Sequence, residues 1–468
     1  MDQADEQRYA LFRTYPGLAS RLPRLPLGSW PTPLEPATRL AAAAGLPFSL
    51  LIKRDDLSAA LYGGNKVRKL ELALARAKAR GRRLVVTSGG LGSNHVVATA
   101  ALGAAVGLET RGLLFCQPVT DHVRRNLLAG VALGADLRWV RDYPGVVVGY
   151  LRALMEGLVA DGRPPYLLMP GGSDALSGVG YANAAFEILA QTREAGLPDP
   201  AALFAPGGTG GTAAGLLAGV ALAGLDTTVV AVRVVAPGLL PESKVRDLAA
   251  ATLRLLARLD PAVERELKTR RILARLARPE AGGLFELEDR FVGEAYGFST
   301  AEGRAAVELA RETHGLRLET TYTGKTLAAL LSYGSFYGSV GRGSAPAQAP
   351  AQLPARVFPA AASRPRPNWL EKATDAGRPV VFVNTYSAAD PAGLAVGDRP
   401  AELVARVPAP LRWCFDRSRR SCRCGLARQC RRFCAVVHAG NGWEWKDEPG
   451  REGTEREGKQ DGSEEAGV

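Results

Sequence analysis

A lysine near the start of an expected helix is the first residue whose setting suggests chemistry. In the segment GGNKVRKLE, Gly63 and Gly64 allow a turn, and Lys66 follows at the head of a helix expected over residues 66–80. The positive end of a helix dipole favours the neutral amine of a lysine, and a neutral amine is a nucleophile that can form a Schiff base. A solvated basic helix end accounts for this segment equally well.

The segment TSGGLGSNHVVATAA combines an expected strand, glycines and small polar residues. A strand over 84–87 leads into Ser93, Asn94 and His95 at the head of a buried helix. Unpaired backbone N–H groups at a helix start can bind a carboxylate. Taken alone, the segment is better explained by a Ser or Asn that caps the helix and by a hydrogen-bonded histidine.

The segment FAPGGTGGTAAGL is a strand, a glycine-rich loop and an apolar helix. The loop consists of Gly207, Gly208, Thr209, Gly210, Gly211 and Thr212. Several backbone amides can converge on one phosphate at such a helix start, and threonine hydroxyls add donors. The loop lacks the lysine of a Walker motif and opens too late in the chain for a dinucleotide fingerprint. It therefore predicts a site for a single phosphate.

Two tyrosines stand in loops from which a side chain could reach a cleft. Tyr296 lies in GEAYGFST, and Tyr322 and Thr323 precede an expected helix in RLETTYTGKT. Each tyrosine could equally be an amphipathic residue at the edge of the core. Only the combination of all these sites is specific.

The elements that would position these residues alternate between strand and helix. The expected strands are 50–53, 84–87, 113–116, 137–140, 166–169, 203–205, 229–235 and 380–383. The expected helices include 66–80, 146–159, the whole of 241–280 and 300–314. This alternation is typical of an α/β fold with a mostly parallel sheet.

Two stretches depart from this pattern. Residues 334–377 are rich in Ala, Pro, Ser and Arg, which predicts a flexible insertion. From residue 413 the chain is rich in Arg and Cys and then in Glu and Gly, so we expect a disordered tail over 413–468.

The tail leaves open a function of another class, which is binding of metal or RNA. Its candidate ligands are Cys422, Cys424, Cys430, Cys434 and His438, with seven arginines over 417–432. The cysteines lack paired Cys-x2-Cys spacing, so we expect no metal site.

Composition excludes several classes of protein. The 468 residues, 46% of them apolar, allow a sizeable core and suggest about three domains. The acidic start and the lack of a run of about 18 apolar residues predict neither a secretory signal nor a membrane span, so a cytoplasmic protein is expected. Cys116 is the one cysteine before residue 413, which excludes a disulfide framework. The net charge of +12 is spread over helices that also carry Glu, so we expect no nucleic-acid partner.

The order of these segments resembles one family of enzymes. The segments are GGNKVRKLE, GGLGSNHVVATAA, PGGSDALSGVGYANAAFE, GGTGGTAAGL and TYTGKT. They resemble the D-cysteine desulfhydrase and 1-aminocyclopropane-1-carboxylate (ACC) deaminase family, which depends on pyridoxal 5′-phosphate (PLP). The resemblance covers about residues 15–335 and 378–384. It implies the tryptophan synthase β-like fold (fold type II), with two lobes of three α/β/α layers.

The resemblance implies cofactor-binding residues. Lys66 would form the Schiff base with PLP, Lys69 would approach the phosphate, and Asn94 would face the 3′ oxygen. Gly208, Thr209, Gly210, Gly211 and Thr212 match the phosphate loop Gly-Ser-Gly-Gly-Thr of the family. Thr323 matches the position beside the pyridine nitrogen, where the deaminases carry Glu. A neutral Thr there argues against opening an unactivated cyclopropane ring.

The resemblance also implies catalytic and substrate-binding residues. The catalytic set is Lys66, Ser93, Tyr296 and Tyr322, and the substrate-binding set is Ser93, Asn94, His95 and Thr385. Thr385 falls where desulfhydrases have Thr and deaminases have Leu. Gly92 replaces the usual Gln, Asn384 replaces His, and Tyr386-Ser387 replaces Gly-Gly, which leaves open a relative that acts on another small amino acid.

The function expected from the resemblance is β-elimination from a small amino acid, in the first place conversion of D-cysteine to pyruvate, hydrogen sulfide and ammonia. ACC deamination is the alternative. Lys66, alone or with Ser93, would remove the Cα proton. Residues 1–55 and 165–412 would form the large PLP-binding lobe and 56–164 the small lobe. The resemblance further implies a homodimer.

Overall fold

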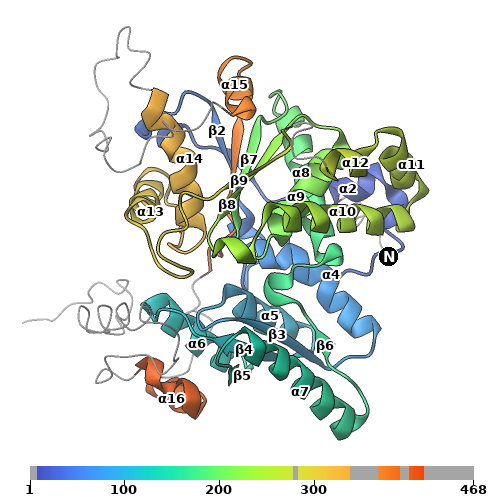
Figure 1. Cartoon of the computed structure of the whole chain (residues 1–468), viewed down its shortest axis with the longest axis vertical. Helices are drawn as coiled ribbons and strands as arrows, with labels where there is room; N and C mark the ends of the chain where they lie inside the picture. Colours follow the sequence, from blue (N-terminus) through green and yellow to red (C-terminus); the bar gives the residue numbers. More distant parts are fainter. Residues whose placement is uncertain (1–7, 278–282, 338–366, 390–399, 416–468) are drawn as a thin grey trace, which may run out of the picture.

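Both sheets of the computed structural model are built almost wholly from parallel strands (Figure 1). The structure describes residues 8–277, 283–337, 367–389 and 400–415. The larger sheet has the order β1 (Leu34–Pro36), β2 (Leu50–Lys53), β10 (Val380–Val383), β7 (Ala202–Gly207), β8 (Thr228–Arg233) and β9 (Phe285–Glu288). The smaller sheet has the order β5 (Asp136–Trp139), β4 (Glu109–Phe115), β3 (Leu84–Gly90) and β6 (Tyr166–Leu167). Only the β1–β2 pair is antiparallel among these strands.

Strand β10 shows how the larger sheet is buried on both faces. All four of its residues are buried. Val381 and Val383 belong to one hydrophobic cluster, and Val380 and Phe382 belong to another. Successive side chains of a strand point to opposite faces, so each cluster fills one side of the sheet. The result is the three-layer arrangement expected from the sequence.

Helices cover both of these faces (Figure 1). The first cluster contains residues of α2 (Ala10–Thr14), α4 (Asn65–Ala79), α8 (Ala175–Glu194), α9 (Gly211–Ala223), α10 (Glu242–Leu259), α11 (Pro261–Thr269) and α12 (Ile272–Ala277). The second contains residues of α3 (Thr38–Ala43), α13 (Ala301–His314), α14 (Thr323–Tyr337) and α15 (Asn368–Thr374).

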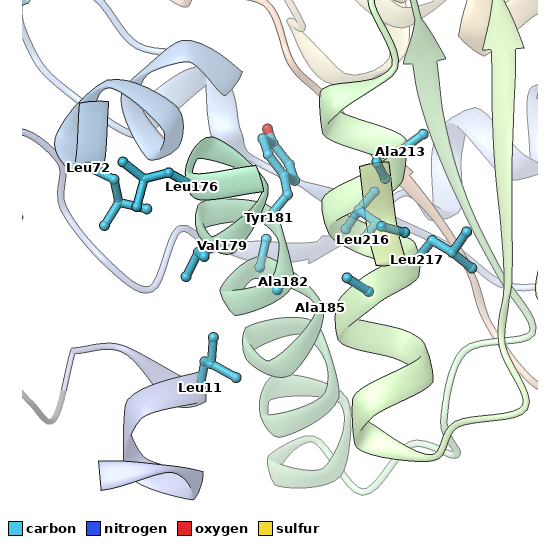
Figure 2. Close-up of a cluster of buried hydrophobic side chains, with 14 of the residues drawn as sticks. Leu11, Leu72, Leu176, Val179, Tyr181, Ala182, Ala185, Ala213, Leu216 and Leu217 are labelled. Carbon is cyan, nitrogen blue, oxygen red and sulfur yellow. The ribbon is translucent and has the colours of Figure 1, made fainter. Parts of the chain in front are cut away.

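Small residues let α8 and α9 approach each other closely. A Cβ added to Gly215 would lie 2.4 Å from the Cβ of Tyr181, and one added to Gly219 would lie 2.6 Å from the carbonyl oxygen of Ala182. Figure 2 shows α8 and α9 running alongside each other, with Ala182 and Ala185 on α8 and Leu216 on α9. This contact fixes α9, which begins within the glycine-rich loop at Gly211, against the core.

The smaller sheet carries α5 (Asn94–Ala105), α6 (Asp121–Ala132) and α7 (Tyr143–Asp161). In Figure 1, α4 runs between the two sheets. Val67, Leu70 and Leu74 of α4 are fully buried. The helix that carries Lys66 is therefore held on several sides. Helix α4 packs in one cluster with residues of both predicted lobes. The predicted lobe boundaries near residues 55 and 165 remain a prediction.

The sequence misses two edge strands and one set of helix breaks. Strands β1 and β9 were not expected, and both are short and lie at the edges of the larger sheet. The helical stretch expected over 241–280 is divided into α10, α11 and α12. The first break is Asp260-Pro261, where Asp260 caps α11, and the second is at Arg271, whose φ is +48°.

The predicted flexible insertion over 334–377 is wrong at both ends. Gly334 is buried in α14, where an added Cβ would lie 2.4 Å from the carbonyl oxygen of Ala44. At the other end, α15 places Trp369 in the core against Phe204 and Tyr333. Residues 338–366 lie outside the described part of the chain.

The predicted boundaries at residues 412 and 413 also need correction. Helix α16 (Pro400–Arg406) and the 3-10 helix η6 (Ala409–Phe415) lie beside α6 (Figure 1). Leu403, Leu411 and Trp413 are buried in one cluster with Leu127 of α6. Residues 400–412 thus pack with the predicted small lobe, and 413–415 belong to the fold. The tail residues 416–468, with their candidate zinc ligands and arginines, lie outside the described part.

Within the described ranges, no helix is long and apolar enough to cross a membrane. The same ranges hold no group of three or more His, Cys, Asp or Glu that could bind a metal ion.

Candidate active site

A cavity of about 400 Å³ brings together most of the residues singled out in the sequence. Its lining includes Lys66, Lys69, Ser93, Asn94, His95, Gly208, Thr209, Gly210, Gly211, Thr212, Tyr296, Tyr322 and Thr385. This volume lies within the range of small-molecule sites. Of the predicted site residues, Thr323 is not part of the lining.

Lys66 is positioned by a turn that requires glycine. Gly64 has a φ of +93°, and a Cβ there would lie 2.7 Å from the carbonyl oxygen of Thr385. That carbonyl accepts a hydrogen bond from the backbone N–H of Asn65 at 3.1 Å. Lys66 follows in the first turn of α4, and burial lowers the pKa of its amine to about 8. The amine is therefore much more nucleophilic at neutral pH than that of an exposed lysine.

The glycine-rich loop forms a narrow cradle at the start of α9. A Cβ on Gly210 would lie 2.9 Å from Leu240, and one on Gly211 would lie 2.4 Å from the Ser173 hydroxyl. Gly210 caps α9 without any side-chain hydrogen bond to the first turn. The backbone N–H groups of this turn are therefore available to an anion. The hydroxyl of Thr209 lies 2.6 Å from that of Ser173 and adds a polar group to the cradle.

A lysine complements this cradle. A Cβ on Gly211 would lie 3.0 Å from Nζ of Lys69, so the Lys69 amine borders the first turn of α9. Burial, and then the neighbouring Lys66, lower the pKa of Lys69 well below its usual value. The negative charge of a bound phosphate would raise the pKa of Lys69 again and so oppose the effects of burial and of Lys66. The cradle, Lys69 and Lys66 therefore fit a phosphate-bearing aldehyde cofactor such as PLP.

Ser93 and Asn94 combine structural roles with positions in the cavity wall. Ser93 caps α5, and its Oγ accepts a hydrogen bond from the backbone N–H of Val96 at 3.3 Å. The Oδ1 of Asn94 accepts hydrogen bonds from Tyr62 at 3.3 Å and from Asn126 at 2.9 Å. The helix-capping interpretation of this segment is thus correct, and the same residues border the cavity.

His95 is held against the smaller sheet. Its Nε2 lies 2.9 Å from the hydroxyl of Thr87 in the middle of β3. Burial, followed by the charges of Lys66 and Lys69, lowers the pKa of His95 well below its usual value. His95 is therefore a neutral wall of the cavity at neutral pH.

The two predicted tyrosines meet in the cavity. Their hydroxyl oxygens lie 2.8 Å apart, and their rings meet nearly edge to face. Thr323, expected beside the cofactor ring, is buried instead in the first turn of α14, where its hydroxyl donates to the carbonyl oxygen of Glu319. Its position does not support direct contact with the ring.

Sequence reasoning missed Glu319 and Gln117, and it named Tyr386 only as a departure from the Gly-Gly pair of the family. All three residues line the cavity. The Glu319 carboxylate accepts backbone N–H groups of Thr321 and Tyr322, both at 2.7 Å. Burial raises the pKa of Glu319, and these bonds offset part of that effect. A Glu three residues before Tyr322 was a visible signal for such a turn. Gln117 and Tyr386 follow strands β4 and β10, and their approach depends on tertiary structure.

Comparisons with known proteins agree with this geometry. The family profile "Pyridoxal-phosphate dependent enzyme" matches residues 25–339. The nocardicin C-9′ epimerase of Nocardia uniformis subsp. tsuyamanensis is 36% identical over 320 residues, which are 66% of this chain and 88% of the relative. The D-cysteine desulfhydrase of Klebsiella pneumoniae (strain 342) is 32% identical over 316 residues, which are 67% of this chain and 88% of the relative.

A third relative and a solved structure extend the comparison. The putative ACC deaminase of Pyrococcus abyssi (strain GE5 / Orsay) is 30% identical over 315 residues, which are 67% of this chain and 87% of the relative. The crystal structure of an ACC deaminase homologue has 23% identity and a TM-score of 0.58, and covers 84% of this chain and 99% of that one. It confirms the fold. The chain therefore belongs to the family of pyridoxal-phosphate dependent enzymes.

Proposed function

We propose that the protein is a PLP-dependent lyase that removes the β-substituent and the amino group of a small amino acid, in the first place D-cysteine. The products would be pyruvate, hydrogen sulfide and ammonia, formed from one D-cysteine and one water. The observation that carries the proposal is the buried amine of Lys66, with a pKa lowered to about 8, in the same cavity as the α9 cradle.

The residues of the chain have separable tasks in this reaction. Bound PLP would supply an electron sink for the electron pair left on the substrate Cα. Lys66 would hold the cofactor through its amine and, once displaced by the substrate, take the Cα proton. The α9 cradle with Lys69 would hold the phosphate, and Asn94 would border the ring. The hydroxyls of Tyr296 and Tyr322 are positioned to donate a proton inside the cavity.

The choice of D-cysteine rests on the curated relatives and on two residues. The desulfhydrase relatives are 32–33% identical over 88% of their length. Thr385 lines the cavity where the resemblance distinguishes desulfhydrases from deaminases. Thr323 is uncharged, and the nearby Glu319 carboxylate is occupied by backbone N–H groups. ACC deamination and reaction on another small amino acid, including epimerisation, are the competing outcomes.

A single assay with the purified holoenzyme separates these outcomes. D-cysteine, L-cysteine, D-serine and ACC are each supplied, and pyruvate, 2-oxobutyrate, sulfide and the chirality of the remaining substrate are measured. We expect sulfide and pyruvate in equal amounts from D-cysteine and little turnover of ACC. Rapid conversion of ACC to 2-oxobutyrate without sulfide from D-cysteine would overturn the order of the two. Loss of chirality without pyruvate would assign an epimerase.

We also propose a homodimer. Helix α7 exposes large apolar residues at helical spacing, including Val147 (59% exposed), Leu151 (57%) and Met155 (58%). A stripe of this kind is a common feature of subunit interfaces. Light scattering coupled to size exclusion should give twice the chain mass, and Leu151→Glu should lower it to that of one chain. The cytoplasmic location stays a prediction.

A further inference from the structure

Gln117 is a buried polar residue of the cavity. None of the catalytic or cofactor-binding tasks proposed above uses it. It follows β4, it lines the cavity, and only 7% of it is exposed. Among the described residues, its Oε1 has no hydrogen-bond partner. A buried polar atom without a partner is destabilising, so a site that keeps one is expected to gain a partner from a ligand.

Two glycines make room for this carboxamide. A Cβ on Gly90 would lie 2.0 Å from Oε1 of Gln117 and 3.1 Å from the ring of Tyr296. A Cβ on Gly92 would lie 3.1 Å from Nε2 of Gln117 and 2.7 Å from Val123 of α6. Gln117 thus fills the space that a side chain at position 92 would need. Glycine is required at position 92 because Gln117 and Val123 occupy the space of a larger side chain. The carboxamide of Gln117 lies at the edge of the cavity beside Tyr296.

The surroundings of Gln117 favour an anionic group of the ligand. The adjacent helix α5 begins at Asn94. The Oγ of Ser93 accepts the N–H of Val96, and the Ser93 carbonyl oxygen accepts the N–H groups of Val96 and Val97. The N–H groups of Asn94 and His95 therefore have no partner within the helix, and they present partial positive charge.

Both acidic residues in the described lining of the cavity already accept backbone N–H groups. These residues are Asp142 and Glu319. Asp142 accepts the N–H of Gly145 at 2.9 Å, and Glu319 accepts the N–H groups of its own turn. Lys66 and Lys69 line the same cavity. The corner is thus suited to a carboxylate.

We propose that Gln117 is a specificity-determining residue that binds the α-carboxylate of the amino-acid substrate. A half turn about the Cγ–Cδ bond exchanges the oxygen and the amino group, so the end without a protein partner can present N–H donors. A carboxylate held between this amide and the start of α5 would be fixed beside Tyr296, with the rest of the substrate extending into the cavity. This inference rests on the proposed function, since it presumes an amino-acid substrate.

The test measures binding by calorimetry of two ligands that differ only at the carboxyl group. D-alanine and D-alaninamide are titrated into holoenzyme of wild type, Gln117→Met and Gln117→Glu. Neither ligand has a β-leaving group, so elimination does not interfere. One hydrogen bond to a charged group corresponds to about 10- to 100-fold in affinity. We expect Gln117→Met to weaken D-alanine by that factor and to leave D-alaninamide within about two-fold.

The glutamate variant has almost the same volume as wild type and keeps the test interpretable if the methionine variant is unstable. We expect it to weaken D-alanine beyond the methionine variant by repulsion, and to keep D-alaninamide binding. For D-cysteine, KM should rise more than kcat falls. Equal losses for both ligands would assign Gln117 a structural role and overturn the inference. If wild type makes pyruvate from D-cysteine and neither variant changes D-alanine affinity, only this inference fails. If wild type binds no amino acid, the proposed function fails with it.

Discussion

The hydroxyl oxygens of Tyr296 and Tyr322 lie 2.8 Å apart inside the cavity, although the two residues come from different loops. Burial raises the pKa of Tyr296 to about 12, and burial raises that of Tyr322 well above its usual value. Both phenols are therefore protonated at neutral pH. When one donates to the other, one O–H proton remains for a substrate atom, so the pair is a proton donor and not a phenolate base.

This pairing predicts unequal effects of removing the two hydroxyls. Tyr322 also borders the α9 cradle, since a Cβ on Gly208 would lie 3.1 Å from its ring. We expect Tyr322→Phe to lower kcat by about 100-fold, as for loss of a positioned acid, and Tyr296→Phe to have a smaller effect. The double variant should resemble Tyr322→Phe, because the residues act as one unit. Steady-state kinetics of the three variants test this, and additive losses would contradict it.

The lowered pKa of Lys66 predicts the pH dependence of cofactor attachment. With a pKa of about 8, roughly 9% of the amine is neutral at pH 7, compared with about 0.03% for an amine at its usual value of 10.5. The rate at which apoprotein acquires the visible absorbance of a PLP–lysine Schiff base should rise about ten-fold per pH unit up to about pH 8 and then level off. Stopped-flow absorbance measures this rate.

Two variants of α4 control that experiment. Lys66→Ala should never develop the absorbance, while Lys78→Ala, at an exposed position of the same helix, should behave like wild type. If the rate of the wild type kept rising to pH 10, the low pKa would be wrong. If Lys66→Ala acquired the band, the attachment site would be wrong.

The cradle predicts a sharp difference between two glycines. Gly211→Ala would place a methyl group 2.4 Å from the Ser173 hydroxyl and 3.0 Å from Nζ of Lys69, so the phosphate site must deform. We expect its Kd for PLP to rise at least about 100-fold, which corresponds to about 2.7 kcal/mol. Gly238→Ala has no atom within 4 Å of the added carbon and an ordinary φ, and it should bind PLP like wild type. Equilibrium dialysis compares the two.

A buried ion-pair network holds the helix that carries Lys66. The Arg68 guanidinium contacts Asp55 at 2.7 Å and Glu187 at 2.6 Å and stacks 4.0 Å above the ring of Trp30. Removing one partner of a buried pair leaves an uncompensated charge, so we expect Arg68→Met to lower the free energy of unfolding by about 3–5 kcal/mol. Urea denaturation measures this loss, and a change below 1 kcal/mol would show that the network does not stabilise the fold.

The same network predicts a dependence of stability on acid. Burial alone would raise the pKa of Asp55, but the Arg68 guanidinium, together with Lys53 and the Tyr181 hydroxyl, more than offsets it, so the pKa is lowered. A carboxyl with a lowered folded-state pKa stabilises the protein above its unfolded pKa, and this contribution is lost as the pH falls through the folded value. The urea midpoint of wild type should fall on acidification below about pH 4, and Asp55→Asn should show less of this dependence.

Local patterns made most of the site predictable. The glycines beside Lys66 and those between Pro206 and Ala213 each form a run within one segment. Such a run can be recognised as a binding loop from the strand expected before it and the helix expected after it. The predicted parallel strands therefore brought these segments to one cavity. Gln117 and Tyr386 follow strands in the same way, but neither has a neighbouring motif, so their presence in the cavity depends on how the two sheets meet.

Tertiary packing accounts for the errors. Residues 334–377 and 413–415 lie in or beside stretches rich in Ala, Pro or Arg, a composition typical of linkers. The few large apolar residues at the edges of these stretches nevertheless pack into the core. Trp369 is fully buried against Phe48 and Phe204. Trp413 is buried against α6 and its neighbours. One tryptophan contributes little to a compositional average and a large part of local burial energy.

The corrected boundary predicts that chains ending at residue 415 and at residue 399 behave differently. Residues 400–415 bury Leu403, Leu411 and Trp413 against α6, and the Arg124 guanidinium of α6 donates to the carbonyl oxygen of Cys414 at 2.9 Å. Each such side chain contributes about 1.5–3 kcal/mol when buried. The shorter chain should therefore lose more than about 3 kcal/mol, and the longer one should unfold like the full chain.

Loss of this segment should also reach the cofactor. Helix α6 carries Asn126, whose amide donates to Asn94 at 2.9 Å and so positions the residue that we propose borders the PLP ring. We expect the 1–399 chain to bind PLP more weakly than the 1–415 chain. The Trp413→Ser variant of the 1–415 chain, which removes the tryptophan packed against α6, should show the same weakening of PLP binding. Urea denaturation and dialysis against PLP measure both effects. Equal stability and equal PLP affinity of the two chains would mean that residues 400–415 do not support α6.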